Sequence, residues 1–382
     1  MATRTIRRGL GSRLGDSFKG VFFGIVLFLV SFVLLWWNEG RAVRQYKQLN
    51  EVRREAVAAL AEPLDPANEG RLLHVTGRAT TPETLADPVF GLDTTAIHLR
   101  RSVEMYQWRE TEQRRTRQRV GGSEETVITY SHRTEWSGQL IDSSRFEEPS
   151  PERRNPQQMP YSDWTGSASQ VALGDFALDT PLIQAMRFYE DLSPERATLP
   201  EGAQRAGQYV YIGADPAQPR VGDVRVSFRY VPESEISVLA RQSGSRLTTW
   251  SDSVGQTYVR VQRGIHTKDA MIAQARGEVR IMTWILRLVG WLMMLFGLNL
   301  VLQPLTVMSS VLPFLGRVVG GGLFLASALL SAVLSLVTIA VAWVWVRPLV
   351  GVPMLIAAVA LLVVQMRRAK KGKQATVTVP AS

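Results

Sequence analysis

Gly20 to Trp37 reads GVFFGIVLFLVSFVLLWW, 18 residues without a single charge. Lipid offers no hydrogen-bond partner to a bare backbone N–H or C=O, so a chain crosses the ~30 Å hydrocarbon core as a helix of about 20 apolar residues. The stretch therefore predicts a transmembrane helix at residues 20–38. A secretory signal peptide has a similar basic front and apolar middle, but no small-residue cleavage site follows this stretch. The pair Trp36-Trp37 is typical of an anchor at the membrane interface, so we favour a retained span.

A second apolar block lies near the C-terminus. Thr283 to Met366 carries only three charges, all of them arginines. The block predicts three further spans, at residues 281–302, 318–346 and 349–366. Arg287 is an intramembrane charge, one to two turns inside the first of these spans. A long arginine near a helix end can extend its guanidinium to the interface, and we favour this interpretation over a functional charge.

Residues 39–280, between the two apolar blocks, are polar and rich in Arg, Glu, Ser and Pro. Two strand-like runs, Ile97 to Trp108 and Val127 to Trp136, flank Gly121-Gly122, as a hairpin would require. Asp223 to Tyr230 alternates cleanly between apolar and polar residues. The fold class that follows is an α-helical polytopic membrane protein with four transmembrane helices. A large α+β domain, mainly of antiparallel strands, lies between the first and second helices.

Four spans place both ends of the chain on one side of the membrane. The ends, residues 1–19 and 367–382, carry ten of the basic residues, and the positive-inside rule assigns them to the cytoplasm. The domain at residues 39–280 is then extracytoplasmic. The signal is mixed, because five basic residues follow the first span on its other side. These are Arg41, Arg44, Lys47, Arg53 and Arg54.

The residue types exclude several chemistries. The chain has no cysteine, which excludes a disulfide framework and a thiolate metal site. Its four histidines lack the spacing of metal ligands, and the phosphate-loop, GxSxG and HExxH motifs are absent. We therefore predict no catalytic, cofactor-binding or metal-binding residues, and no enzyme activity. The predicted spans contain no Asp or Glu, which argues against an ion-coupled transporter.

Small residues recur in the third predicted span. One row is Gly322 and Ala326, and another is Ser327, Ser331 and Ser335. Such rows allow helix backbones to approach closely in lipid, and serines can hydrogen-bond across the contact. Two interpretations are equally supported: self-association of the chain, and packing within the protomer's own bundle. The same hydroxyls, with Asn299 and Thr338, are also compatible with an uncoupled channel.

Charged and aromatic side chains gather on one predicted strand of the domain. We predict a partner-binding surface there, formed by Arg101, Glu104, Tyr106 and Trp108. Packing against neighbouring strands would explain Tyr106 and Trp108 equally well.

Several runs of sequence keep a characteristic order and spacing from about residue 18 to residue 366. They include NEGRAV at 38–43, NEGRL at 68–72, LRRSVEMYQW at 99–108, GWLMM at 290–294 and GLNL at 297–300. In these runs the chain resembles the transmembrane protein 43 (LUMA) family. The resemblance implies four spans, cytoplasmic ends and a large domain on the lumenal or extracytoplasmic side. It also implies a non-enzymatic role, because eukaryotic members associate with themselves and with other membrane proteins and help organise the inner nuclear membrane and endoplasmic reticulum.

The source and function follow as expectations. Arginine outnumbers lysine 38 to 6, which suggests a GC-rich bacterial genome and hence a bacterial inner membrane. The favoured function is a self-associating membrane scaffold whose extracytoplasmic domain binds partners. The expected partners are the lipid bilayer, further copies of the chain and other membrane or envelope proteins. Nucleic acid is not expected, because the net charge of +10 is explained by basic ends that contact anionic headgroups. An envelope or membrane-stress sensor and an uncoupled channel or pore are the alternatives.

Overall fold

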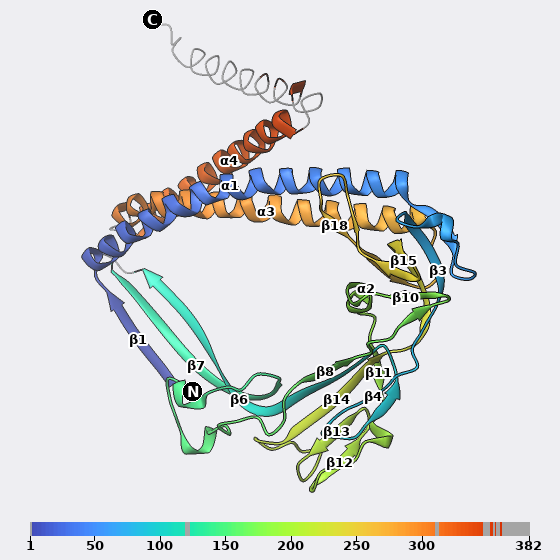
Figure 1. Cartoon of the computed structure of the whole chain (residues 1–382). Helices are drawn as coiled ribbons and strands as arrows, with labels where there is room; N and C mark the ends of the chain where they lie inside the picture. The colour runs from blue at the N-terminus through green and yellow to red at the C-terminus, as the bar shows by residue number, and fades with distance from the viewer. Residues whose placement is uncertain are drawn as a thin grey trace, which may run out of the picture. The chain divides into compact units, whose positions relative to one another are not determined.

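The computed structural model describes residues 2–118, 123–309 and 313–346, together with residues 352, 353, 356 and 360. Contacts divide the chain into two compact units, both drawn in Figure 1. The helical unit contains Thr5–Lys47, Arg115–Thr126 and the chain from Ala275 onward. The strand-rich unit is built mainly from Gln48–Arg114 and Val127–Gln274.

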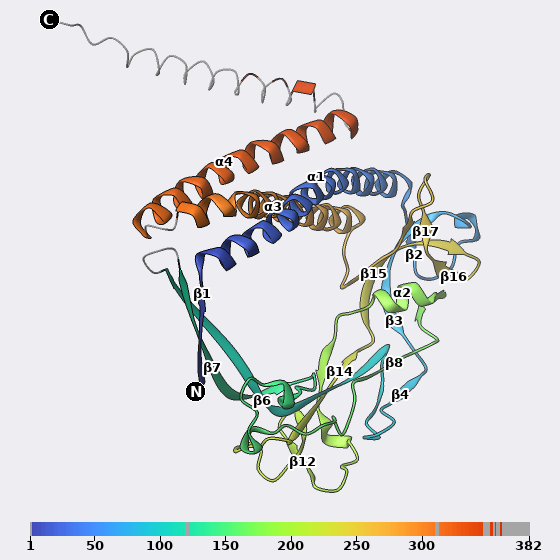
Figure 2. The same ribbon diagram turned by 90° about the vertical axis from the view of Figure 1, so that its left-hand side faces the viewer.

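Three long helices supply most of the helical unit. They are α1 (Leu10–Glu55), α3 (Lys268–Ser309) and α4 (Pro313–Val346). α1 and α3 run side by side in both views (Figure 1, Figure 2). In the described part of the chain, these three helices are long and apolar enough to cross a membrane, and they cover the predicted spans at 20–38, 281–302 and 318–346. The fourth predicted span, at 349–366, and the basic tail at 367–382 lie outside the described residues, apart from residues 352, 353, 356 and 360.

Most strands of the described chain belong to two larger sheets. The first has the order β1-β7-β6-β14-β13-β12, with β11 paired to β14 and β8 paired to β6. Its strands are β1 (Ala2–Arg8), β6 (His98–Gln118), β7 (Glu124–Ser137), β8 (Trp164–Ser167), β11 (Glu190–Leu192), β12 (Ala203–Ala206), β13 (Tyr209–Ile212) and β14 (Val224–Val231). The turn at the predicted Gly121-Gly122 lies outside the described residues. In β14 the alternate residues Val224, Val226 and Phe228 are buried, which confirms the alternation in the sequence.

The second sheet has the order β19-β15-β16-β10-β9-β3-β2, with a further pairing of β15 to β3. Its strands are β2 (Val57–Leu60), β3 (Leu72–Thr80), β9 (Ala172–Leu173), β10 (Phe176–Leu178), β15 (Ser234–Ser243), β16 (Arg246–Thr248) and β19 (Arg260–Arg263). Two small ribbons, β4 (Thr84–Ala86) with β5 (Asp93–Thr95) and β17 (Trp250–Ser251) with β18 (Thr257–Tyr258), complete the set. The large domain is therefore rich in sheet and mainly antiparallel.

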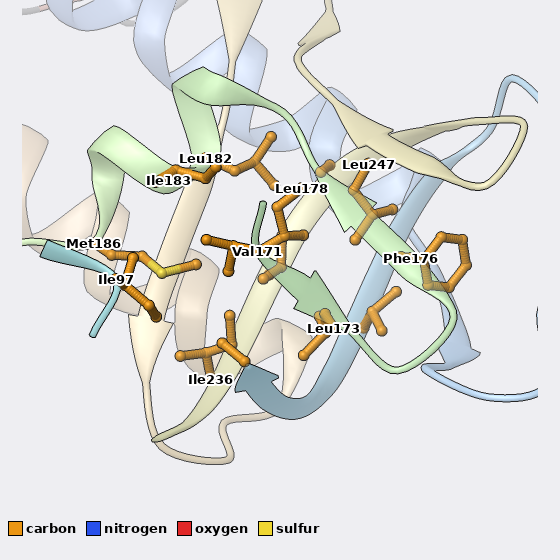
Figure 3. Close-up of a cluster of buried hydrophobic side chains, with 14 of the residues drawn as sticks. Ile97, Val171, Leu173, Phe176, Leu178, Leu182, Ile183, Met186, Ile236 and Leu247 are labelled. Carbon is orange, nitrogen blue, oxygen red and sulfur yellow. The ribbon is translucent and has the colours of Figure 1, made fainter. Parts of the chain in front are cut away.

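Two apolar cores stabilise the strand-rich unit. In the first, the short helix α2 (Thr180–Ala185) lays Leu182 and Ile183 over the second sheet, where they meet Leu178 and Val171 (Figure 3). The second core is centred on Phe90, which contacts the ring of Phe228 edge-on at a centroid distance of 5.6 Å. Burial of such side chains is the main favourable term in folding.

Two buried histidines make the stability of this unit dependent on pH. Burial lowers the pKa of His98 and of His74 below the ordinary value of 6.5. The ring of His98 is neutral when Nε2 donates to the Ile183 carbonyl at 2.8 Å and Nδ1 accepts from Ser167 Oγ at 2.8 Å. Below pH 6.5 the unfolded chain binds more protons than the folded one. The stability that comes from keeping a buried histidine neutral is therefore complete above pH 6.5 and is lost as the pH falls toward the lowered pKa.

We expect this loss to be at most about 1.4 kcal/mol per pH unit for each histidine. Denaturant unfolding of the protein at about pH 7.5 and about pH 5.5 would measure it. His98→Gln retains a side-chain donor and should reduce the difference between the two pH values. A variant with both histidines replaced and an unchanged pH dependence would show that other groups cause the effect.

Candidate functional site

One carboxylate in the helical unit receives hydrogen bonds from two other helices. Glu39 lies on α1 and is only 1% exposed. Arg287 of α3 donates to it twice, from Nε to Oε1 at 2.7 Å and from Nη2 to Oε2 at 2.8 Å. The indole N–H of Trp343 on α4 donates to Oε2 of the same carboxylate. These three side chains, which we call the Glu39 clasp, tie α1, α3 and α4 together.

The clasp explains how an arginine is accommodated inside an apolar bundle. A buried charge is costly unless it is paired and hydrogen-bonded. Besides its bidentate contact with Glu39, the guanidinium of Arg287 lies 4.9 Å from the ring centroid of Trp284 and 5.8 Å from that of Trp343, distances at which a ring face attracts a cation. The sequence favours extension of this side chain to the interface, and in the structure its guanidinium bonds to a carboxylate of the protein itself.

A polar network continues from the clasp along α1 and α3. Asn38 is buried, and its Nδ2 donates to the backbone carbonyl of Thr283 at 3.1 Å. Arg41 donates from Nη2 to Asn38 Oδ1 at 3.3 Å and to Thr283 Oγ1 at 3.4 Å. Asn38, Glu39 and Arg41 of the sequence run 38–43 thus contact α3 and join the two helices.

The same two helices approach closely where glycines face each other. A Cβ atom on Gly297 of α3 would lie 2.8 Å from the backbone nitrogen of Phe28 and 2.9 Å from the carbonyl oxygen of Gly24, both on α1. A Cβ atom on Gly24 would lie 2.7 Å from Leu300 Cβ. Small residues at such crossings let backbones meet in lipid. The small residues predicted from the sequence to pack are those of α4, and this glycine pair was not among them.

The two small-residue rows of α4 have different surroundings. Ser327, Ser331 and Ser335 are at most 5% exposed, and Ser335 Oγ lies 3.6 Å from Met294 Sδ of α3. This row therefore packs within the protomer. Among the described residues, Gly322 and Ala326 are exposed, and none of their atoms lies within 4 Å of a Cβ placed on Gly322.

Arg101 does not lie on the predicted partner surface. Its Nη1 donates to both carboxylate oxygens of Asp87, at 2.7 and 2.8 Å, and the two side chains are only 4% and 0% exposed. Successive side chains of a strand point to opposite faces, so an odd-numbered position cannot share a face with residues 104, 106 and 108. Those three, Glu104, Tyr106 and Trp108, are half-buried on the other face of β6.

On the half-buried face of the first sheet, aromatic rings lie around one arginine. Arg225 forms an ion pair with Glu104 at 2.6 Å, and its guanidinium lies 4.6 Å from the ring centroid of Trp136 and 5.2 Å from that of Tyr209. Tyr106 packs against Trp136 at 5.1 Å. We call this set of five residues the aromatic face. Beside it, burial and the Asp223 carboxylate raise the pKa of the Tyr211 hydroxyl, which donates to that carboxylate at 2.6 Å.

The sequence alone assigns Glu39 no role, because this residue lies just beyond the first predicted span at residues 20–38. Its partner lies 248 positions away, so no local pattern could identify the pair. The depth of the two residues in the membrane was the signal that the sequence offered. In antiparallel spans, a carboxylate just beyond the end of the first span and an arginine just inside the start of the second lie at similar depths. Within the described residues, no group of three His, Asp or Glu side chains is placed to hold a metal ion.

Comparison with known proteins places the chain in a family. The family model described as Transmembrane protein 43 matches residues 105–348. Human Transmembrane protein 43 is 32% identical over 378 residues, covering 95% of this chain and 92% of the human protein. The rat protein is 32% identical over 357 residues, covering 89% and 88%, and the fruit fly homologue is 29% identical over 356 residues, covering 91% and 94%. No solved structure matches. The chain therefore belongs to the transmembrane protein 43 family.

Proposed function

We propose that the chain is a non-enzymatic membrane scaffold that associates with further copies of itself through α4. The bundle is held together internally by the Glu39 clasp, the Gly24–Gly297 crossing and the serine row of α4. The observation that carries the proposal is the outward position of the other row, because Gly322 and Ala326 are exposed and have no role in that internal packing. In lipid, exposed small residues four positions apart favour contact with a second helix.

The aromatic face of the strand-rich unit also supports the scaffold hypothesis. Tyr209 is 37% exposed, and the side chains of Arg225 and Glu104 are 27% and 37% exposed. Tyrosine, tryptophan and arginine are the residue types that most often dominate binding energy at protein interfaces. We propose this face, which includes Glu104 and Tyr106 of the predicted surface but not Arg101 or Trp108, as the surface that binds other membrane or envelope proteins.

Gly322→Leu tests self-association. Leucine at this open position should block close contact between two α4 helices while leaving the protomer's own packing intact. We expect the fraction of multi-subunit particles, counted by single-molecule photobleaching in vesicles at several protein-to-lipid ratios, to fall at least about tenfold, which corresponds to about 1.4 kcal/mol.

Two controls separate association from folding. Phe324→Ala changes a side chain on the face of α4 opposite Gly322, 51% exposed, and should leave the subunit count unchanged. Ser331→Leu overfills the buried row and should lower thermal stability instead. A wild-type protein that is monomeric at every protein-to-lipid ratio would remove the basis of the scaffold hypothesis.

The channel alternative receives less support from the same helices. Ser335 Oγ donates to the carbonyl of Ser331 at 2.7 Å, Thr338 Oγ1 to that of Leu334 at 2.7 Å, and Asn299 Nδ2 to that of Leu295 at 2.8 Å. Each polar group thus bonds to its own helix, as expected in a packed apolar bundle. These contacts favour packing as their role over the lining of a water-filled path.

A further inference from the structure

Three exposed cations lie where α1 and α3 extend beyond their apolar segments. Arg44 and Lys47 of α1 and Arg280 of α3 are exposed, and no hydrogen bond or ion pair joins them to another described residue. Arg41 lies beside them, and the partners of its guanidinium are the neutral side chains of Asn38, Gln45 and Thr283. We call Arg41, Arg44, Lys47 and Arg280 the basic collar.

The collar belongs to one level of the helix pair. Asn38 contacts Thr283, and the Tyr46 hydroxyl donates to the Arg276 carbonyl at 3.5 Å, so the two helices are in contact on both sides of this level. Glu39 does not neutralise the collar, because it is already bonded to Arg287 and Trp343. Glu278 is the single acidic residue between Ala275 and Arg280.

Exposed tryptophans mark the depth of the collar. Trp36, Trp37 and Trp284 are 41%, 50% and 62% exposed, and indole rings in such positions settle at the membrane interface. Arg41 and Arg280 are each four residues beyond this tryptophan level, about 6 Å along a helix. The headgroup layer occupies roughly the first 5–8 Å outside the hydrocarbon core. Arg44 and Lys47 lie farther out, about 10 and 15 Å beyond Trp37 along α1, and their long side chains extend back toward this layer.

We propose that the basic collar binds the phosphate groups of anionic phospholipids on the membrane face where α1 emerges. The occupant follows from charge and depth, because unpaired cations at the headgroup level attract anionic lipid. Arginine supplies planar donors that match phosphate oxygens. The proposal also accounts for the mixed topology signal. These cations would bind lipid on the membrane face opposite the basic ends of the chain, where the positive-inside rule predicts fewer basic residues.

Bromolipid quenching of tryptophan fluorescence tests the proposal with the full chain. The protein would be reconstituted into phosphatidylcholine vesicles that contain either brominated phosphatidylglycerol or brominated phosphatidylcholine. We expect wild-type protein to prefer phosphatidylglycerol, with a preference that weakens as salt is added. Arg44→Gln, Lys47→Gln and Arg280→Gln should each reduce the preference about fivefold, equivalent to about 1 kcal/mol per cation.

A charge-matched control uses exposed arginines of the strand-rich unit: Arg187→Gln, Arg196→Gln and Arg220→Gln combined. This triple variant should keep the wild-type preference. Equal quenching by the two lipids in the wild type, or an equal loss in the control, would overturn the proposal. Loss of the preference in about 10 mM inorganic phosphate, but not in sodium chloride of equal ionic strength, would instead identify a site for free phosphate and would also overturn it.

Discussion

Glu39→Gln is expected to lower the free energy of unfolding of the helical bundle by about 3–5 kcal/mol, because it removes the charge that pairs with a buried arginine. Glutamine keeps nearly the same size and still offers an oxygen to the Trp343 indole, so packing is little changed. What is lost is the negative charge opposite Arg287, whose side chain is 16% exposed. Thermal unfolding in lipid nanodiscs, followed by helical circular dichroism, would measure the loss.

Glu55→Gln is the matched control for this variant. Glu55 is the last residue of the same helix and is exposed. We expect a change within about 0.5 kcal/mol, as for other surface substitutions. A Glu39→Gln protein as stable as the Glu55→Gln protein would mean that the clasp contributes nothing to the bundle.

Gly297→Ala is expected to destabilise the bundle by about 1–3 kcal/mol although it adds only one methyl group. The added carbon would lie 2.8 Å from the Phe28 nitrogen and 3.0 Å from the Phe28 Cα. Both are backbone atoms that cannot rotate away, so α1 and α3 must separate. The same nanodisc measurement applies.

Gly277→Ala provides the control on the same helix. No atom lies within 4 Å of a Cβ at Gly277, and alanine favours helix over glycine by about 1 kcal/mol. This substitution should leave stability unchanged or increase it. If both alanine variants were stabilised alike, helix propensity alone would explain the data and the close crossing would have no energetic role.

Much of the architecture could be predicted because it follows from local patterns. The apolar run at residues 20–37 and the two apolar stretches later in the chain are continuous, and α1, α3 and α4 contain them. Alternation similarly identified β14. Contacts between distant residues left no such pattern, so the Glu39 clasp and the Gly24–Gly297 crossing required the structure. Arg101 is an intermediate case. Successive residues of a strand point to opposite faces, so its position in the sequence alone would have separated it from Glu104.

The sidedness of the N-terminal segment stays a prediction. The positive-inside rule placed residues 1–19 in the cytoplasm, opposite the domain. In the structure, residues 2–8 form β1 beside β7, and Arg7 Nε lies 3.3 Å from Glu125 Oε1. A span at residues 20–38 would place these two segments on opposite sides of the membrane. Cysteines introduced at Ser12 and Ser123 and labelled with an impermeant maleimide would distinguish the two arrangements: labelling from one side supports the strand pair, and labelling from opposite sides supports the sequence-based topology.

The central claim is that one carboxylate organises three membrane helices, and a double-mutant cycle tests it most directly. The cycle compares Glu39→Gln, Arg287→Met and the combined variant by unfolding in nanodiscs. Since each single change leaves one polar group of the pair without its partner, we predict a coupling energy of about 2–3 kcal/mol, with the combined variant more stable than Glu39→Gln alone. Two single effects that simply add in the combined variant would contradict the clasp.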